Sequence, residues 1–454
     1  MAKAMTTKSV LISLLLIFVA VLVGATDILI GEYESSSVFF VLMLLAIISG
    51  FWMNGSQSLY CVGFLFFMSW FVFVLARPMI GILSGDESVF HVTFGREYWL
   101  SRNEISSTLS FWSMSGLSFF AGYFLLGKRD ESFYVEKIVY GADKKLKILR
   151  ALLAISFFII PVIFITKISA FLSGGYGALY QGQSEYQFNF TRILDFIIPL
   201  ILSIYITADQ DKKYSRMVFI VIFSYVLSSL VVGQRAAFGV WLLVFFWVKY
   251  GVHKNKAPLL IWGGGVIAFI FIAQIFEAYR SNLQFNFDFI NKFLINQGMT
   301  FFLPYFYNNI DEPSLYTKLF SIFPGGSLAQ SFGLVTSDAS NISRYLSSSL
   351  SMTHFENGFG IGGSFFIEIY SLSNNIYIHS ILIFCIGLII SKAENLSKHD
   401  NRFLFWFAML MPSLMLISRG SIYTLSSQLI YSVCIFSFFS FIMLLLRGKL
   451  WRRW

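Results

Sequence analysis

Charged residues are scarce in this chain of 454 residues: they make up 13% of it, whereas apolar residues make up 57%. In a soluble domain close to a quarter of the residues are charged. The scarcity excludes an ordinary soluble protein and predicts an integral membrane protein. The formal net charge of +9 does not indicate nucleic-acid binding, because basic residues in a membrane protein mostly mark its cytoplasmic loops.

Cysteine, histidine and nucleotide-binding motifs are also sparse. The three cysteines, Cys61, Cys385 and Cys434, lie within apolar runs and predict neither a disulfide framework nor a metal site. The five histidines lack the spacing of metal ligands. No glycine-rich stretch continues into the Lys-Ser/Thr pair of a phosphate-binding loop. The sequence therefore predicts no metal and no cofactor.

Long apolar runs fill most of the chain. About 20 apolar residues in a helix cross the hydrocarbon core of a bilayer. The runs cover approximately residues 10–26, 37–53, 58–76, 108–127, 148–170, 193–208, 216–233, 236–250, 258–276, 365–391, 403–418 and 424–446. We therefore expect an all-α, polytopic membrane protein with about twelve transmembrane helices. The first is expected to be retained, because it lacks a clear signal-peptide cleavage site.

Basic residues assign an orientation to these helices. With the N-terminus inside, the predicted cytoplasmic segments hold 22 of the 33 lysines and arginines, as the positive-inside rule requires. An even number of helices then places both termini in the cytoplasm. The external side has eight arginines but only three lysines, and arginine is preferred where a planar fork must hold phosphate or carboxylate. This face is either a phosphate-binding face or one where arginines pair with external carboxylates.

Three of the external arginines, Arg235, Arg280 and Arg419, lie at or near predicted helix ends. An arginine so near the apolar core is costly and usually has a partner or a function. One arginine alone can also extend its charge to the lipid headgroups. Because all three fall on the same face, we predict that they bind an anionic group together.

One long polar stretch interrupts the apolar pattern. It divides the chain into a bundle of nine helices over residues 1–276, a large external loop over 277–364 and three further helices over 365–454. The aromatic residues of 281–307 favour a helix in the membrane interface, although they would also suit sugar stacking. Residues 308–360 predict an irregular external loop with short helices, and a loop of this length is usually functional.

Candidate acid–base residues lie at the end of this loop. His354 and Glu356 are within it, and Glu368 lies in the outer part of the next apolar helix, which we expect to be kinked or broken at Asn374 and Asn375. An ionisable residue in a membrane helix predicts a functional site, here with one of the arginines as its partner. A purely structural Glu–Arg pair is the alternative.

Three short motifs accompany these residues: VVGQRAAF at 231–238, GGSFFIEIY at 362–370 and ISRGS at 417–421. Together with twelve predicted helices and a large external loop before the third-last helix, they resemble the Wzy family of bacterial O-antigen and capsule repeat-unit polymerases. The resemblance covers most of the chain. The chain departs from members with a duplicated Arg-x10-Gly loop motif, since it has no clear copy of that motif.

The resemblance implies a GT-C-like polymerase/ligase architecture in the bacterial inner membrane, with its active face in the periplasm. It implies that an oligosaccharide on undecaprenyl pyrophosphate is the substrate and that the growing chain moves to a new lipid-linked unit. It further implies a chain-length-regulating co-polymerase as a partner. In this scheme the three arginines bind the pyrophosphate, and one of the three acid–base candidates accepts the proton of the acceptor hydroxyl.

Two other functions stay open at this point. A ligase that moves finished O-antigen to a lipid A core would share nearly all of these features. A flippase for lipid-linked oligosaccharides would need charges along a path through the bilayer, and charges in the middle of the predicted helices are almost absent. We therefore expect a glycosyltransferase.

Overall fold

The computed structural model describes most of the helices and many of the connections between them. The described residues are 7–29, 32–53, 60–126, 142–178, 190–208, 213–231, 235–252, 264, 271, 289–336, 338–357, 359–434 and 437. Within these ranges the chain is helical apart from loops and one two-stranded antiparallel sheet. This agrees with the predicted helical class.

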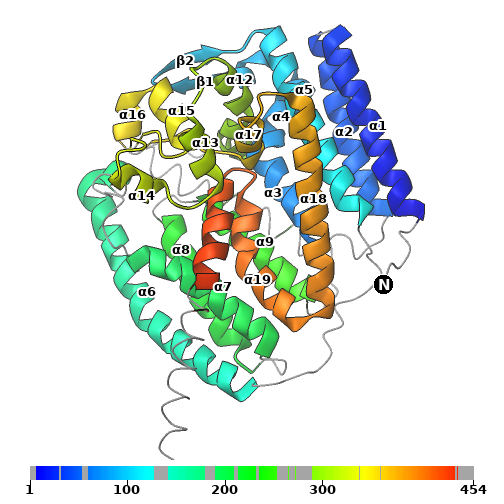
Figure 1. Ribbon diagram of the computed structural model, residues 1–454. Helices are drawn as coiled ribbons and strands as arrows, with labels where there is room; N and C mark the ends of the chain where they lie inside the picture. Colours follow the sequence, from blue (N-terminus) through cyan, green and yellow to red (C-terminus); the bar gives the residue numbers. More distant parts are fainter. Residues whose placement is uncertain are drawn as a thin grey trace, which may run out of the picture.

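The N-terminal part of the chain forms long helices and one small hairpin (Figure 1). The helices are α1 (Thr7–Leu29), α2 (Tyr33–Met53), α3 (Val62–Trp70), α4 (Ala76–Ser84), α5 (Arg102–Leu125), α6 (Ala142–Ala178), α7 (Phe190–Ala208), α8 (Ser215–Val231) and α9 (Arg235–Phe246). A π-helical turn, Phe71–Leu75, joins α3 to α4, and another, Trp247–Val252, extends α9. A short 3-10 helix, Glu87–Phe90, leads into the hairpin strands β1 (His91–Phe94) and β2 (Arg96–Trp99).

Shorter helices follow, and then the last long ones. They are α11 (Phe289–Gln297), the 3-10 helix Gly298–Phe302, α12 (Leu303–Asn308), α13 (Leu315–Ile322), α14 (Gly326–Ser331), α15 (Ile342–Leu350), α16 (Met352–Glu356), α17 (Phe365–Tyr370), α18 (Ile376–His399) and α19 (Asn401–Leu416). Residues 422–434 are also helical and run back beside α19. In Figure 1 the hairpin and α12–α16 form a cap above α6, α8 and α19, level with the upper parts of α5 and α18.

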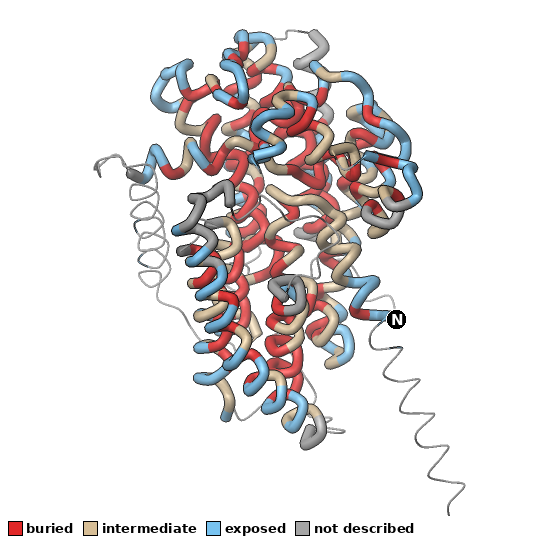
Figure 2. The backbone as a smooth tube through the Cα atoms, turned by 90° about the vertical axis from the view of Figure 1, so that its left-hand side faces the viewer, coloured by how far each residue is buried: buried red, intermediate tan, exposed pale blue. Residues whose placement is uncertain are grey.

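Helix α5 lies at the centre of one group of helices and packs against α1, α2 and α18. Glycines let α5 and α18 approach closely: a Cβ atom at Gly122 would overlap the carbonyl oxygen of Phe384, and one at Gly387 would overlap that of Phe119. Helix α19 belongs to a second group, with α7 and α9. Figure 2 shows that buried residues gather where helices meet, whereas exposed ones lie on their outer sides.

Polar side chains connect α5 to its neighbours inside this core. Ser115 Oγ lies 2.8 Å from His379 Nε2. The Tyr123 hydroxyl donates to the Glu394 carboxylate and accepts the N–H of Gly63 at 2.9 Å. Because Ser115 meets α18 near its start and Tyr123 meets it near its end, α5 and α18 run in the same direction, as the predicted orientation requires.

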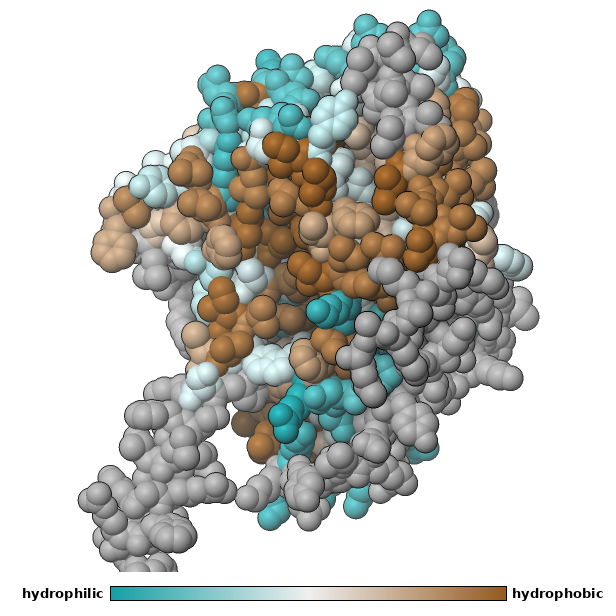
Figure 3. Space-filling view, turned by 45° about the vertical axis from the view of Figure 1, so that its right-hand side comes forward, coloured by the Kyte–Doolittle hydropathy of each residue, from teal (hydrophilic) through white to brown (hydrophobic). Residues whose placement is uncertain are grey.

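Four described helices are long and apolar enough to cross a membrane: Tyr33–Met53, Val62–Ser84, Lys145–Thr166 and Ile376–His399. Shorter apolar helices accompany them, among them Asn401–Leu416. In Figure 3 apolar side chains cover the middle of one face and hydrophilic ones gather at its upper end. The count of twelve spans stays a prediction, since nearly all of the predicted segment 258–276 lies outside the described residues.

The predicted break before α18 is confirmed. Helix α17 ends before two asparagines, and Asn374 has a φ of 51°, a left-handed conformation that asparagine tolerates better than most residues. Asn375 caps α18, since its Oδ1 accepts the N–H groups of Tyr377 at 2.9 Å and Ile378 at 3.2 Å. The break ends the helix that was expected to continue from residue 365.

The cap differs in part from its prediction. Residues 308–360 do form an irregular region with short helices. Residues 289–307, however, do not form one helix at the membrane interface: their aromatic side chains Phe293, Phe301, Phe302 and Phe306 are buried inside the protein. They pack against α4, α5 and the π-helical turn Phe71–Leu75, because an aromatic-rich segment can bury its rings against helices as readily as in lipid.

Candidate active site

A buried arginine anchors one wall of the site. Arg77 of α4 donates to three main-chain oxygens: Nε to Val89 at 2.8 Å, Nη1 to Ile295 at 3.2 Å and Nη2 to His91 at 2.5 Å. Its guanidinium lies 4.6 Å from the ring centroid of Phe302, a cation–π contact. Arg77 is therefore a structural arginine, which fixes the end of α11 and the following turn.

That fixed segment holds a second arginine. Gln297, the last residue of α11, is buried, and its Oε1 accepts a hydrogen bond from Nη1 of Arg419. A guanidinium has only donors, so the amide oxygen must face it. Arg419 also lies 5.2 Å from the ring centroid of Phe73. Phe73 belongs to the π-helical turn Phe71–Leu75, and such turns inside helices often mark functional sites.

Two of the sequence motifs meet at this arginine. Arg419 lies in the turn 417–421 between α19 and the helix that follows. The N–H of Gly363 donates to Arg419 O at 3.2 Å, and the N–H of Phe365 donates to Ile417 O at 3.1 Å. The extended chain before α17 is thus joined to the turn through its main chain, although the two segments are more than fifty residues apart in sequence.

Glu368 lies on the inner side of the same junction. Its side chain is 1% exposed, and Oε2 accepts the N–H of Ile422 at 2.8 Å. Within the described part of the chain, Oε1 has no hydrogen-bond partner. Helix α17 belongs to none of the four candidate spans. Burial raises the pKa of Glu368 to about 8, against the lowering effect of the Ser421 hydroxyl and the Ile422 N–H, so this carboxyl can exchange a proton near neutral pH.

Two buried hydroxyl groups add to the polar character of the junction. Thr300 Oγ1 and Ser364 Oγ are buried, and neither has a hydrogen-bond partner among the residues described. Gly362, with a φ of 83°, faces both walls: a Cβ atom there would lie 3.9 Å from Thr300 Oγ1 and 3.7 Å from Arg419 O. Buried polar atoms usually find partners, so these atoms fit a site that takes a hydrogen-bonding ligand.

The junction lies beside a candidate membrane helix. Ser69 of α3 donates to Met415 O at 2.5 Å, and its Oγ lies 3.1 Å from Ser418 Oγ. Phe73, which contacts Arg419, is the middle residue of the candidate span Val62–Ser84, about 16 Å from its start at 1.5 Å per residue. The sequence predicted Arg419 at the external end of a helix, whereas the structure places it beside the middle of this candidate span.

The family model described as O-antigen polysaccharide polymerase Wzy matches residues 9–449. The chain belongs to this family. The match covers nearly the whole chain and confirms the resemblance predicted from the sequence. No curated protein and no solved structure matches it. Wzy proteins are membrane-embedded polymerases that act on lipid-linked oligosaccharide repeat units, so Arg419 and Glu368 are candidates for the chemistry of such a polymerase.

The other two acid–base candidates of this Wzy protein lie elsewhere in the cap. His354 and Glu356 are on the exposed helix α16. His354 Nδ1 lies 3.1 Å from Ser351 Oγ, and its ring centroid is 5.3 Å from that of Phe94 in β1. No described contact joins either residue to Glu368. The structure therefore does not bring the three candidates together.

The side chains of the other two predicted arginines, Arg235 and Arg280, lie outside the described part of the structure. Arg235 is the first residue of α9, which packs against α19, but its side chain lies outside the described residues. Arg280 lies wholly outside them. Their assignment to pyrophosphate binding stays a prediction.

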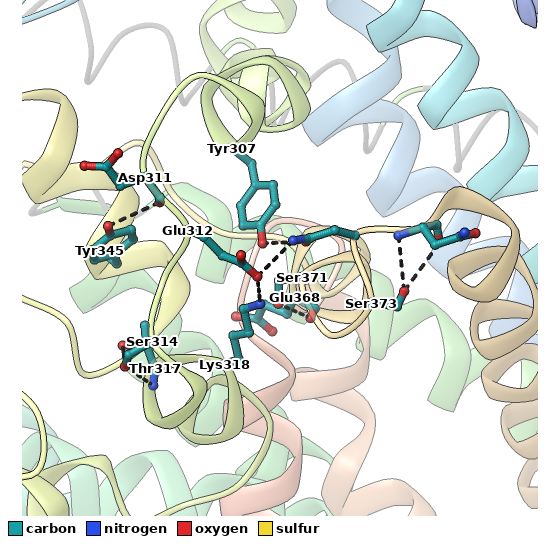
Figure 4. A network of polar contacts seen from close by, with 12 residues as sticks. Tyr307, Asp311, Glu312, Ser314, Thr317, Lys318, Tyr345, Glu368, Ser371 and Ser373 are labelled. Carbon is teal, nitrogen blue, oxygen red and sulfur yellow. Dashed lines mark hydrogen bonds and ion pairs between the residues drawn. The ribbon is translucent and has the colours of Figure 1, made fainter.

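A polar network beside the site was not predicted from the sequence (Figure 4). Tyr307 donates to Asn374 Oδ1 at 2.8 Å, and Asn374 Nδ2 donates to Glu312 at 3.0 Å. Lys318 forms an ion pair with Glu312 and holds the pKa of that carboxyl below its usual range. The sequence signal was the asparagine pair, which predicted a helix break but not the bonds it makes. Among the described residues, no group of three or more His, Cys, Asp or Glu could hold a metal ion.

Proposed function

We propose that this Wzy protein transfers the growing polysaccharide from undecaprenyl pyrophosphate to a new repeat unit on the same carrier, at a site open to the periplasm. The observation that carries the proposal is the junction around turn 417–421. This turn joins a fixed guanidinium to a buried carboxyl. Arg419 belongs to the turn, and the Glu368 carboxylate of α17 accepts the N–H of Ile422, the residue directly after the turn. A cation and a base are what a metal-independent transfer from a diphosphate donor requires.

The proposed reaction is one displacement. A hydroxyl oxygen of the acceptor sugar attacks the anomeric carbon of the donor sugar and forms the new glycosidic bond. The bond between that carbon and the pyrophosphate oxygen breaks, and the hydroxyl proton passes to the Glu368 carboxylate. Negative charge develops on the leaving pyrophosphate, and Arg419, held in place by Gln297 and Phe73, stabilises it. Arg235 and Arg280 are predicted to complete this anion site.

The wider arrangement is part of the same proposal. We infer about twelve transmembrane helices in the bacterial inner membrane, with both termini in the cytoplasm. Residues 1–276 and 365–454 form the membrane bundle, and 277–364 form the periplasmic loop. A chain-length-regulating co-polymerase is the expected protein partner. The gathering of the short helices α12–α16 and the hairpin toward one end of the molecule supports this arrangement.

The direct test is a polymerisation assay with purified protein in lipid vesicles. Lipid-linked repeat units are added with and without a chelator, and products are separated as a ladder. We expect a chelator-resistant ladder for the wild type and at least a hundredfold slower polymerisation for Arg419→Ala, the order found when one charge-stabilising donor is removed. Arg402→Ala is the matched control: Arg402 is exposed at the start of α19, the helix that leads into the turn of Arg419. Normal polymerisation by well-folded Arg419→Ala would contradict the proposal.

The same assay decides between the acid–base candidates. If Glu368 is the base, Glu368→Gln slows ladder formation about 10²- to 10⁴-fold, whereas His354→Ala and Glu356→Gln keep the wild-type rate. Loss of activity in one of the latter two, with Glu368→Gln active, would move the base to helix α16. Adding a lipid A core acceptor separates polymerase from ligase, because a ligase would transfer single repeat units to it without forming a ladder.

A further inference from the structure

Helix α13 (Leu315–Ile322) has the reverse polarity of a helix at a water-facing surface. Its buried side chains are polar: Thr317, Lys318 and Ser321. The exposed side chains on and just after it are apolar: Leu315 (68%), Tyr316 (48%), Leu319 (38%) and Phe323 (55%). A surface helix in water turns its apolar stripe inward and its polar face outward. The reversal indicates that the medium outside α13 is apolar.

Hydrogen bonds place the end of α13 at the depth of the active site. Ser421 Oγ donates to Ser321 O at 3.0 Å, and Ser426 Oγ donates to Ile322 O. Ser421 follows Arg419 by two residues. The exposed apolar face is therefore next to the turn that holds Arg419.

The buried face of α13 lies toward the helix that carries Glu368. Helix α13 packs against α17, the helix that carries Glu368. In Figure 4 Lys318 extends from α13 to its ion-pair partner Glu312. One helix, about 10 Å across, thus separates the catalytic junction from the apolar medium outside.

We infer that the exposed face of α13 holds the lipid chain of the lipid-linked repeat unit while its diphosphate reaches Arg419. This rests on the proposed function, in which the site takes a diphosphate on a lipid carrier. Ordinary phospholipid chains share the chemistry of this face. The substrate chain is favoured because two hydrogen bonds tie α13 to the turn and helix next to Arg419, so a chain lying on α13 ends beside the site.

Photocrosslinking tests this placement without turnover. A benzophenone amino acid replaces Leu319 or Phe323, and the purified protein is placed in phospholipid vesicles with undecaprenyl-pyrophosphate-linked repeat unit that is radiolabelled in its polyprenyl chain. Ile389 of α18 is the matched control, because it is 65% exposed on a candidate span away from the site. We expect several-fold more labelled product at the two α13 positions than at residue 389, and we expect excess unlabelled undecaprenyl pyrophosphate to abolish the difference.

Equal labelling at α13 and at residue 389 would overturn the inference, since it would show an ordinary lipid surface. Photoproducts with a protein, or none with lipid, would overturn it as well. Steady-state kinetics test the same inference. Leu319→Ser should raise the KM for the lipid-linked unit roughly tenfold, the order expected when a leucine contact is lost. Ile389→Ser should leave this KM unchanged. A combined variant with Glu368→Gln should keep the crosslinks. If Glu368→Gln still polymerised, the catalytic proposal would fail while the crosslinking result stood.

Discussion

Replacing Glu368 by glutamine tests both the protonation state of this carboxyl group and its role as the base. Glutamine keeps an oxygen for the N–H of Ile422 but does not titrate. Burial raises the pKa of Glu368 from 4.5 to about 8, so the folded protein binds this proton more tightly than the unfolded chain does. The stability of the wild type must therefore fall as pH rises from about 4.5 to about 8, and then level off.

The size of this effect follows from the shift. At about 1.4 kcal/mol per pKa unit, a rise from 4.5 to about 8 disfavours the charged folded form by at most about 5 kcal/mol. Relative to the wild type, Glu368→Gln should thus gain stability with increasing pH, and the gain should be complete above about pH 8. Unfolding in detergent micelles at a series of pH values measures it. Thr353→Ala, a change at an exposed side chain without a titratable group, should show no such trend.

Activity should change in the opposite direction. A general base contributes typically 10²- to 10⁴-fold, so we expect polymerisation by Glu368→Gln to fall by about that factor while its stability rises. The wild-type rate should increase with pH up to about 8, as the carboxyl ionises. A stability difference that does not depend on pH would refute the burial argument. A fully active variant would refute the catalytic role.

Three further substitutions test how the scaffold is held, each by thermal unfolding of the purified protein. Arg77→Lys cannot reach all three main-chain oxygens and should cost about 3 kcal/mol, the order of one or two lost charged hydrogen bonds. Gly387→Ala places a methyl group against a main-chain oxygen of α5 and should destabilise far more than Cys385→Ala on an exposed part of α18; equal effects would contradict the close helix contact. Tyr123→Phe should cost about 2 kcal/mol, and the loss should shrink if Glu394 is first replaced by glutamine.

The membrane class and the helix break were readable from the sequence because each depends on local composition. Apolar runs identify helices in lipid, and two adjacent asparagines stop a helix wherever it lies. The meeting of 362–370 with 417–421 was only implied by their shared side of the membrane. A main-chain hydrogen bond between Gly363 and Arg419 joins these segments. Every residue has the same main-chain groups, so the sequence does not show which of them will pair.

The residues that fix Arg419 could not have been predicted. Gln297 and Phe73 are neutral, and Gln297 is one of several amide residues in an aromatic-rich stretch. The sequence drew attention to charged residues, yet an arginine in a buried site can be oriented by an amide oxygen and a ring. Depth was missed for a related reason. Hydropathy locates the ends of apolar runs, but it does not show that the turn after α19 stops beside the middle of a neighbouring span.

Helix α13 shows the same limit more sharply. Its sequence, LYTKLFSI, has an apolar and a polar side in either environment. In water the apolar side would face the core, and the loop around it would be external. In hydrocarbon the polar side must turn inward, where the main-chain oxygen of Ser321 accepts a hydrogen bond from the Ser421 hydroxyl, because an unpaired polar group in lipid is costly. The amphipathic pattern alone fits both arrangements, so only the contacts of α13 in the folded chain show which side faces out. That choice determines whether the predicted external loop is a lid in water or a wall between the site and the lipid.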